Sequence, residues 1–503
     1  MARGASGGRL SSLLGTPSRF MQPRIILYIT TFALVAFGLL MIYSSSSIVA
    51  MTSEDTNYNA AYYVTRQAVF VAAGLAAAAF VAFTDYHLWS RTLLPLIWVA
   101  TVALLVLVFT AAAGRDAYGA TRWIEVGQFN LQPSEFAKVT IILTAANLAS
   151  RYFEERSLTL DRFFELMVIG VAVPLILIVF QPDKGTTIIC AATIFVMAYL
   201  AGVPRSWLLA ALALGVVGVL VLSLKDEYSR ARVLTMLNPW KDPYGDGYQL
   251  IQGFYAFSSG GLFGVGVGLS RQKYSYLPMA YNDFIFAVIG EELGLVGTLG
   301  VLLGFGLLVW AGFQIARYAP DMCGRLIAAG CTTLILIQLL VNIGGVLGMI
   351  PLTGKPLPFL SYGGSSIVSC LLLVGFVASV SRHSALPETA YDRARHGFSA
   401  GPEAAYAARD DYALVGEATP RSARPAGNSA GFSVVSGSGS ARVGSSVQPG
   451  RAGDTSVEGI RASRAFSEAH SSGRVTTDAS GRRRIDLGPS AADRLRSSRG
   501  KSN

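Results

Sequence analysis

Ten apolar segments dominate the sequence, and each is long enough to cross a membrane. A helix of about 20 apolar residues spans the hydrocarbon core of a bilayer. Soluble globular proteins have about 25% charged residues, whereas this chain has 14% charged and 52% hydrophobic residues. A soluble enzyme is therefore excluded, and the pattern predicts an all-α polytopic membrane protein with ten transmembrane helices. The segments are 25–47, 64–83, 93–113, 133–150, 163–180, 186–202, 207–224, 284–313, 325–347 and 363–381.

The charged residues divide the chain into three parts. Residues 1–381 contain 42 charged residues, whereas the much shorter segment 382–503 contains 30. Ser, Gly, Ala and Arg dominate that last segment, so we expect a disordered basic tail. The prediction is a short N-terminal segment, 1–24, a membrane domain, 25–381, and the tail, 382–503.

The distribution of Lys and Arg predicts the orientation in the membrane. Cytoplasmic loops carry an excess of these residues. With the N-terminus inside, the short inner segments carry 11 of them and the outer segments carry 6. Both termini are then cytoplasmic. The net charge of +10 is explained by membrane topology, so it does not indicate a nucleic-acid partner. The six outer cations oppose the bias and need a reason: Arg66, Arg115, Arg122, Lys138, Lys184 and Lys355.

Segment 225–283 is predicted to be one long outer loop of 59 residues between the seventh and eighth helices. Loops of this length in compact proteins are usually functional or disordered. The aromatic residues and the glycine-rich stretch SSGGLFGVGVGLS at 258–270 favour a functional loop.

Two polar clusters precede predicted helices on the outer side. In GATRWIEVGQFNLQPSEFAK, 119–138, Glu135 and Lys138 lie three residues apart on one helix face. On this cluster alone a self-satisfying ion pair is favoured, and Arg122 beside Trp123 fits an interfacial anchor. The second cluster is QPDKGTT at 181–187. It fits a simple turn, except that Lys184 lies on its outer face.

The third cluster, LPMAYNDFIFAVIGEELGLVG at 277–297, places Asp283 at the start of a helix. A short acidic side chain there can cap free backbone amides, which is the alternative to a catalytic role. Glu291 and Glu292 lie about 12 Å further along the helix. At that depth we expect them to face the bundle interior and to be paired or protonated.

The fourth cluster, PLTGKPLPFLSYGGSS at 351–366, is too rich in Pro and Gly to be a regular span. Such backbone is tolerated at membrane depth only where protein or water covers it, so a re-entrant loop with Lys355 is predicted. Together the clusters bring Asp283, Glu135 and several cations to one face. That combination suits an anionic substrate from which a proton is removed.

The clusters resemble motifs of the SEDS family (shape, elongation, division and sporulation) of bacterial membrane proteins. The motifs are GATRW followed by QPSEFAK, QPDKGTT, SSGGLFGVGVG, DFIFAVIGEELG and PLPFLSYGGSS, in family order over about 25–381. The resemblance implies ten helices and the polymerisation of lipid II, an undecaprenyl-pyrophosphate disaccharide-pentapeptide. It also implies Asp283 as the catalytic carboxylate, and substrate-binding roles for Arg122, Glu135, Lys138, Lys184 and Lys355.

The chain departs from the family pattern at several positions. Met279, Tyr281 and Asn282 replace the Glu, His and Thr that often precede the catalytic Asp. Asn130 stands where many members carry Arg, and Lys184 stands where an apolar residue is usual. Lys184 is therefore expected to replace the missing cation.

The resulting hypothesis is a peptidoglycan glycosyltransferase of septal cell-wall synthesis, with Asp283 as the general base of an inverting transfer. The segment 348–366 and the polar tail favour the division branch of the family over the elongation branch. The expected partners are a class B penicillin-binding protein and other division membrane proteins. A divalent cation, Mg²⁺ or Mn²⁺, could assist. The alternatives are an elongation polymerase, a lipid II flippase that uses Glu291 and Glu292, and a non-catalytic scaffold.

Overall fold

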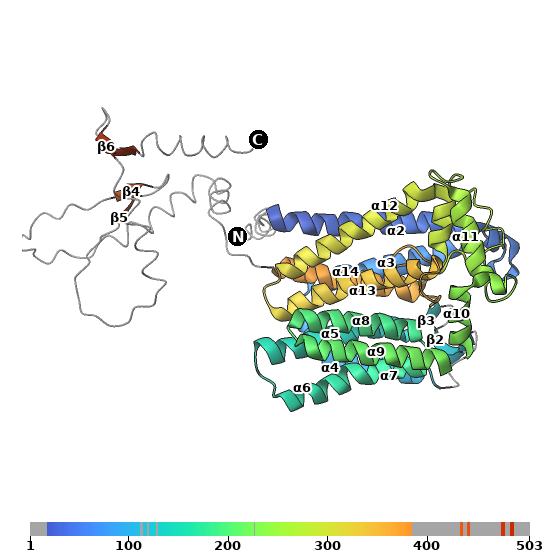
Figure 1. Ribbon diagram of the computed structural model, residues 1–503, viewed down its shortest axis with the longest axis horizontal. Coiled ribbons are helices and arrows are strands. Elements are labelled where there is room, and N and C mark those ends of the chain that lie inside the picture. Colours follow the sequence, from blue (N-terminus) through green and yellow to red (C-terminus); the bar gives the residue numbers. More distant parts are fainter. Residues whose placement is uncertain are drawn as a thin grey trace, which may run out of the picture. The chain divides into compact units, whose positions relative to one another are not determined.

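The computed structural model describes residues 18–384, except 111–113, 118–119, 127–128 and 226, and four short strands within 433–486. Two units, Met1–Arg409 and Asp410–Asn503, are separate. The first unit is a bundle of helices that run side by side (Figure 1). Most of the predicted N-terminal segment and most of the predicted disordered tail lie outside the described residues.

Each of the ten predicted apolar segments lies on helical structure. The segment 163–180 is built from two α-helices joined by a π-helical turn, Val168–Ala172, and the segment 93–113 is α-helical only as far as Leu107. The helices are α2 (Ser18–Thr52), α3 (Tyr62–Phe83), α4 (Leu94–Leu107), α5 (Pro133–Ala149), α6 (Leu160–Met167), α7 (Val173–Phe180), α8 (Lys184–Ala201), α9 (Arg205–Lys225), α12 (Ile285–Arg317), α13 (Met322–Val346) and α14 (Gly364–His383).

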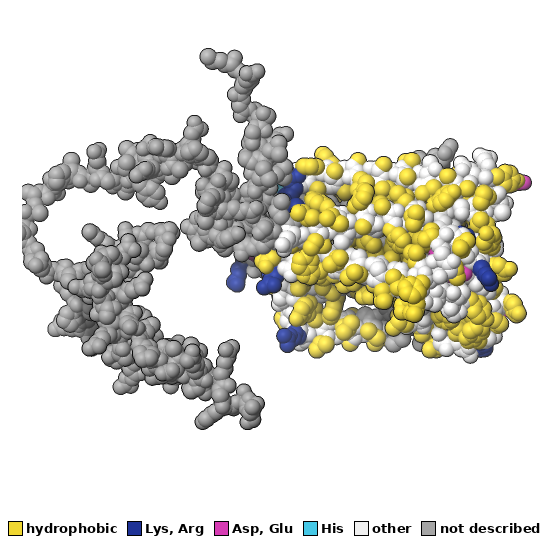
Figure 2. Space-filling model, turned by 90° about the horizontal axis from the view of Figure 1, so that it is seen from above, with side chains coloured by type: hydrophobic (Ala, Val, Ile, Leu, Met, Phe, Trp, Pro, Cys, Tyr) yellow, Lys and Arg dark blue, Asp and Glu magenta, His cyan; other side chains and the backbone are white. Residues whose placement is uncertain are grey.

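Seven helices in the described part of the chain are long and apolar enough to cross a membrane. The chain is thus a multi-pass membrane protein, and the count of ten spans stays a prediction for α4, α5 and α9. At 1.5 Å per residue, the 14 residues of α4 are shorter than the hydrocarbon core, which is about 30 Å thick. Hydrophobic side chains cover much of the visible face of the bundle (Figure 2).

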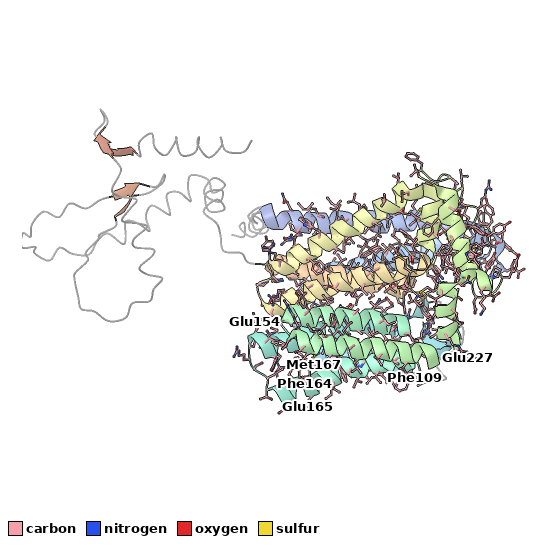
Figure 3. The ribbon with its side chains drawn as sticks, viewed as in Figure 1. Phe109, Glu154, Phe164, Glu165, Met167 and Glu227 are labelled. Atoms are coloured by element: carbon pink, nitrogen blue, oxygen red, sulfur yellow. The ribbon has the colours of Figure 1, made fainter. Side chains whose placement is uncertain are left out.

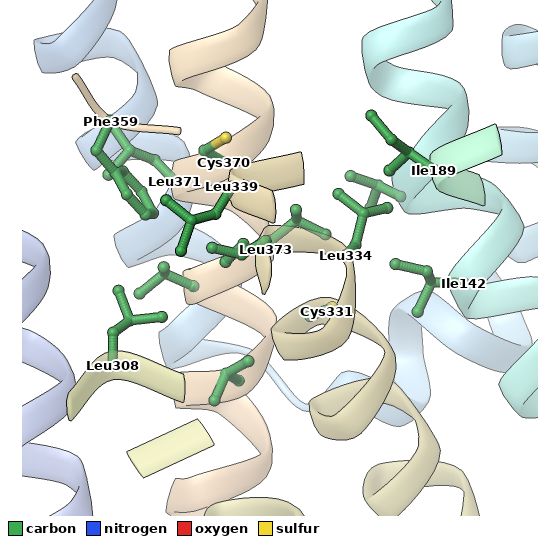
Figure 4. Close-up of a cluster of buried hydrophobic side chains, with 14 of the residues drawn as sticks. Ile142, Ile189, Leu308, Cys331, Leu334, Leu339, Phe359, Cys370, Leu371 and Leu373 are labelled. Atoms are coloured by element: carbon green, nitrogen blue, oxygen red, sulfur yellow. The ribbon is translucent and has the colours of Figure 1, made fainter. Parts of the chain in front are cut away.

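Helices α5, α13 and α14 form the centre of the bundle. All residues of α5 except Phe136 are buried, and α14 is buried along most of its length. Ile142 of α5, Ile189 of α8 and Leu334 of α13 belong to the same buried cluster (Figure 4). Polar residues of the three helices also contact one another: Lys138 of α5 donates to Gln338 of α13, and Ser369 of α14 donates to the carbonyl of Glu135.

A small antiparallel sheet departs from the all-α prediction. Its strands are β1 (Gly114–Ala117), β2 (Ala120–Val126) and β3 (Phe129–Leu131), in the order β1-β2-β3. Ile124 of β2 is buried and pairs with Leu131 of β3. The sequence ATRWIEV does not alternate regularly between apolar and polar residues, so it lacks the period-2 pattern that indicates a strand. The described strands of the second unit pair as two hairpins: β4 (Ser433–Val435) with β5 (Ser440–Arg442), and β6 (Arg474–Thr477) with β7 (Arg483–Asp486).

The predicted outer loop 225–283 contains helices of its own. They are α10 (Glu227–Leu237), the 3₁₀ turn Pro239–Lys241 and α11 (Tyr248–Gly260). Leu250, Ile251 and Ala256 of α11 are buried, which gives the helix an apolar face against the bundle. The segment is therefore an ordered cap at one end of the bundle (Figure 1).

Helix α12 is broken at Gly294, which has φ 66° and ψ −160°. The glycine-rich loop 261–266 fills the break. Two of its amides donate to the carbonyls of Glu291 and Glu292, and two of its carbonyls accept from the two residues after Gly294, all at 2.9–3.1 Å. The predicted straight span 284–313 is thus two helical pieces that the loop holds together.

The side chains of Glu291 and Glu292 are buried, as predicted, and both are paired. Glu291 accepts a 2.9 Å hydrogen bond from the amide of Arg271. Glu292 accepts from the Ser44 hydroxyl at 2.7 Å and lies 3.5 Å from the Lys273 ammonium. Both carboxylates therefore contact the segment 270–273, and Glu292 also contacts α2, which gives them a structural role rather than a place on a polar path through the bundle.

Substitution of Gly264 tests this loop. Its φ is +79°, and a Cβ there would lie 2.2 Å from the Glu292 carbonyl oxygen. Gly264→Ala is expected to lower the free energy of unfolding by about 1–3 kcal/mol. Gly300→Ala on α12 is the matched control, because a Cβ there meets nothing within 4 Å and Ala is the better helix former. Unfolding in detergent measures both; equal midpoints would contradict the account.

Candidate active site

Three segments far apart in the sequence, 122–132, 282–283 and 354–366, line one cavity at the end of the bundle that carries β2, β3 and α10 (Figure 1). The cavity has a volume of about 140 Å³. It brings together three of the six predicted site residues, Arg122, Asp283 and Lys355, beside Gln132 and Ser365. Glu135, Lys138 and Lys184 do not line it.

A buried ion pair lies beside this cavity, and one of its members, Lys355, lines it. The Lys355 ammonium lies 2.7 Å from one carboxylate oxygen of Asp183 and donates to the other at 2.9 Å. Asp183 also accepts from Ser134 at 2.9 Å, from Gln132 at 3.1 Å and from the amide of Thr186 at 3.2 Å. The last contact caps the start of α8, so one carboxylate organises a helix end and a loop.

The charge of Asp183 follows from these contacts. Burial alone would raise its pKa, but the Lys355 ammonium, assisted by Arg122 and the amide of Thr186, holds the pKa well below its ordinary value. Asp183 is therefore ionised. Our sequence analysis missed this residue, although an Asp that precedes a helix, with Thr three positions later, is a capping signal.

Glu135 and Lys138 form a second buried ion pair beneath the cavity. The Lys138 ammonium donates to Glu135 at 2.7 Å and to the side-chain oxygen of Gln338 at 2.8 Å. Each member of the pair is only 1% exposed. The geometry favours the self-satisfying ion pair that the sequence left open over direct contact with a substrate.

The other two predicted cations differ in their positions. Arg122 lines the cavity and donates to the carbonyls of Gln181 (3.2 Å) and Pro182 (2.5 Å). It therefore holds the 181–187 turn while part of its side chain faces the cavity. Lys184 is half-buried and donates to the hydroxyl of Ser229 on α10 at 2.5 Å, which ties α8 to α10.

Asp283 lies two residues before α12 begins. Phe284 occupies the N-cap position and no side chain caps the helix, so the capping alternative for Asp283 is wrong. Within the described residues, the Asp283 carboxylate makes no ion pair. Burial raises the pKa of Asp283 to about 6, and the positive charge of Arg232 opposes part of this rise. The carboxylate is thus available to a ligand and titrates near neutral pH.

Helix α13 fixes the backbone on both sides of the cavity. The side-chain amide of Asn342 donates to the carbonyls of Asp283 and Lys355, both at 2.8 Å. One turn earlier, Gln338 donates to the carbonyl of Pro356 at 3.0 Å. Sequence analysis did not single out these two amides. The pattern that could have indicated them is a pair of amide side chains, four residues apart, inside an apolar span.

The described residues contain no group of three or more His, Cys, Asp or Glu side chains that could hold a metal ion. Mg²⁺ is often held by one or two carboxylates together with substrate phosphates. Asp283 is the carboxylate that the cavity would offer to such an ion, which would offset negative charge on the substrate.

Comparison with known proteins identifies the family. A family model described as "Cell cycle protein", covering FtsW, RodA and SpoVE, matches residues 24–386. The chain is 41% identical over 364 residues to stage V sporulation protein E of Bacillus subtilis (strain 168), covering 72% of this chain and 98% of that protein. It is 38% identical over 369 residues to a probable peptidoglycan glycosyltransferase FtsW of Trichlorobacter lovleyi, covering 73% and 96%.

Solved structures agree with this result. A chain of a peptidoglycan synthase complex aligns with a TM-score of 0.58 and 30% identity, covering 72% of this chain and 98% of that chain. The rod shape determining protein RodA of Thermus thermophilus aligns with a TM-score of 0.52 and 26% identity, covering 72% and 97%. These are multi-pass membrane proteins of one fold. The chain belongs to the SEDS family of FtsW, RodA and SpoVE, as its motifs predicted.

Removal of one member of the Asp183–Lys355 pair should be more harmful than removal of both. Lys355→Met leaves a buried carboxylate without its cation and is expected to lower the free energy of unfolding by about 3–5 kcal/mol. Asp183→Asn combined with Lys355→Met should recover at least half of that loss. Denaturant unfolding in one detergent gives both values. If Lys355→Met were as stable as the wild type, the ion pair would not be needed for stability, and Lys355 would be available to bind substrate.

Proposed function

We propose that this protein is a peptidoglycan glycosyltransferase that polymerises lipid II, with Asp283 as the general base. Family membership supports the activity, since close relatives bear that name. The observation that carries the mechanism is the state of Asp283. It is a cavity-lining carboxylate without an ion-pair partner among the described residues, whereas Asp183 and Glu135 are both committed to lysines.

The chemistry follows from that carboxylate. Asp283 accepts the proton of the 4-hydroxyl of the acceptor N-acetylglucosamine. The hydroxyl oxygen attacks the anomeric carbon of the donor glycan and inverts it. The bond from that carbon to the phosphate oxygen breaks, and undecaprenyl pyrophosphate leaves. A general base contributes about 10²–10⁴-fold to such a rate, and its pKa of about 6 leaves it ionised at neutral pH.

The surrounding contacts keep this base in place. Asn342 holds the backbone of Asp283 at a fixed position relative to Lys355. Arg122 holds the 181–187 turn and contributes positive charge to the same cavity. Fixed dipoles and charges of this kind stabilise charge that develops in a transition state without reorganising at the moment of reaction.

The cellular setting is part of the proposal. Ten spans with both termini in the cytoplasm would place the cavity on the outer face of the bacterial plasma membrane. A class B penicillin-binding protein is the proposed partner, since one similar structure comes from work on polymerization and crosslinking by a peptidoglycan synthase complex. Similarity to both FtsW and stage V sporulation protein E supports septal synthesis with other division proteins. Elongation, as by RodA, is the alternative.

A flippase has less support. It needs polar side chains that line a path across the membrane, and Glu291 and Glu292 were the candidates. Glu291 accepts from the amide of Arg271, and Glu292 contacts Lys273 and Ser44. Their burial therefore has a structural explanation that involves no transport.

Asp283→Asn tests the catalytic proposal. The expected result is a loss of glycan polymerisation of about 10²–10⁴-fold, with an unchanged midpoint of unfolding. Asn keeps the size of the side chain and removes the basic oxygen. Glycan chain length from purified lipid II, supplied with the class B partner, measures the effect.

Glu227→Gln is the matched control for Asp283→Asn. Glu227 begins α10 at the end of the bundle that carries the cavity, whereas Glu154 lies toward the other end (Figure 3). The Glu227 side chain is 94% exposed. It should polymerise lipid II at the wild-type rate. Near wild-type synthesis by Asp283→Asn would show that another group is the base.

The rate should also depend on pH. The pKa of Asp283 is about 6, so the base becomes protonated and inactive as the pH falls through that value. We expect kcat/KM at pH 5 to be about a tenth of its plateau above pH 7. Lipid II polymerisation from pH 5 to 8, with the midpoint of unfolding followed in parallel, measures this. A constant kcat/KM over that range would exclude Asp283 as the base.

A further inference from the structure

The buried lysines near the proposed active site are already paired within the protein. Lys138 is paired with Glu135, and Lys355 is paired with Asp183. A pyrophosphate leaving group carries several negative charges and needs cations of its own. A different side chain must therefore bind the phosphates.

A second cavity lies beside the proposed active site. It has a volume of about 260 Å³ and is formed by α10, the start of α11 and the loop at 350–352. Thr235 and Gln249 give it polar groups, Met236 and Leu250 give it apolar ones, and Arg232 lies in its wall.

One loop joins the two cavities. Arg232 donates to the carbonyl of Leu352, and Leu352 lines the second cavity. Two residues later, Gly354 lines the first cavity, where a Cβ would lie 3.8 Å from the Asp283 carboxylate. The charge of Arg232 also acts on Asp283 directly, since it lowers the pKa of that carboxyl. The guanidinium of Arg232 and the carboxylate of Asp283 thus both lie near this loop, at Leu352 and at Gly354.

We propose that the second cavity is the donor subsite and that Arg232 binds the pyrophosphate of the donor lipid. This inference rests on the proposed function. A guanidinium has five N–H donors in a planar fork, so it can donate to a carbonyl and to phosphate oxygens at once. Bidentate contact of this kind is the reason that arginine is frequent at phosphate sites.

The position suits the reaction. The proton of the acceptor hydroxyl passes to Asp283, and the pyrophosphate gains negative charge as its bond to the anomeric carbon breaks. The phosphates would extend from that carbon toward Arg232. Arg232 would offset that charge, and the apolar side chains of Met236 and Leu250 suit the first part of the lipid chain. Asp246, an exposed residue, also lines this cavity and would repel a phosphate placed beside it.

Binding in an inactive background tests the subsite without turnover. The full chain carries Asp283→Asn, and the probes are undecaprenyl diphosphate, undecaprenyl monophosphate and undecaprenol in lipid nanodiscs. Arg232→Met should weaken binding of the diphosphate by about ten- to a hundredfold, the usual loss for a hydrogen bond to a charged group. Binding of undecaprenol should not change.

Two further variants separate charge from structure. Arg230→Met is the matched control, two residues away on α10 with its side chain 55% exposed, and it should bind the diphosphate within twofold of the parent. Arg232→Gln keeps a donor for the Leu352 carbonyl but loses the charge, so it should resemble Arg232→Met.

The outcomes are distinguishable. Diphosphate binding by either Arg232 variant within twofold of Arg230→Met would overturn the inference. An equal loss of undecaprenol binding in both Arg232 variants would do so too, because it would assign Arg232 to the structure of the loop. Polymerisation by Asp283→Asn at the wild-type rate would instead refute the proposed base, whatever the binding results.

Discussion

The ion pair between Asp183 and Lys355 is the contact on which the candidate active site depends. It joins the start of α8 to an irregular loop that forms no helix or strand of its own up to Gly364. A buried charge without a partner is strongly destabilising, so neither residue can leave unless the other moves with it. Because Gln132 and Ser134 share the same carboxylate, β3 and α5 are held at the same point. These contacts fix the segments that surround the cavity.

Hydropathy was sufficient to predict where the long apolar helices lie, because each apolar segment must be covered by lipid or by protein, but it did not predict α10 and α11 within 225–283. It could not predict the break at Gly294. The hydrogen bonds that make this break tolerable come from loop 261–266, and no local pattern in α12 reports them. The hairpin of β2 and β3 was missed for a related reason. Its seven-residue strand, Ala120–Val126, lies within a motif whose polar residues indicated chemistry rather than strand pairing.

The site was predictable only in part for a different reason. A charge near a bilayer signals that a partner exists, but sequence does not tell whether that partner is a substrate or another side chain. Asp283 lines the cavity, whereas Lys138 faces Glu135 and Lys184 faces Ser229. The partner of Lys355 lies 172 residues earlier in the chain, which only the folded structure reveals.

The broken helix has a consequence for motion. The glycine-rich loop 261–266 and the residues around Gly294 satisfy each other's backbone groups, so the loop cannot detach without exposing unpaired amides and carbonyls in an apolar environment. Opening would cost several unmade hydrogen bonds at once. The loop and the first turns of α12 should therefore behave as one cooperative unit. Backbone amides in both would exchange with solvent at similar rates, although one segment looks like a surface loop and the other like a membrane helix.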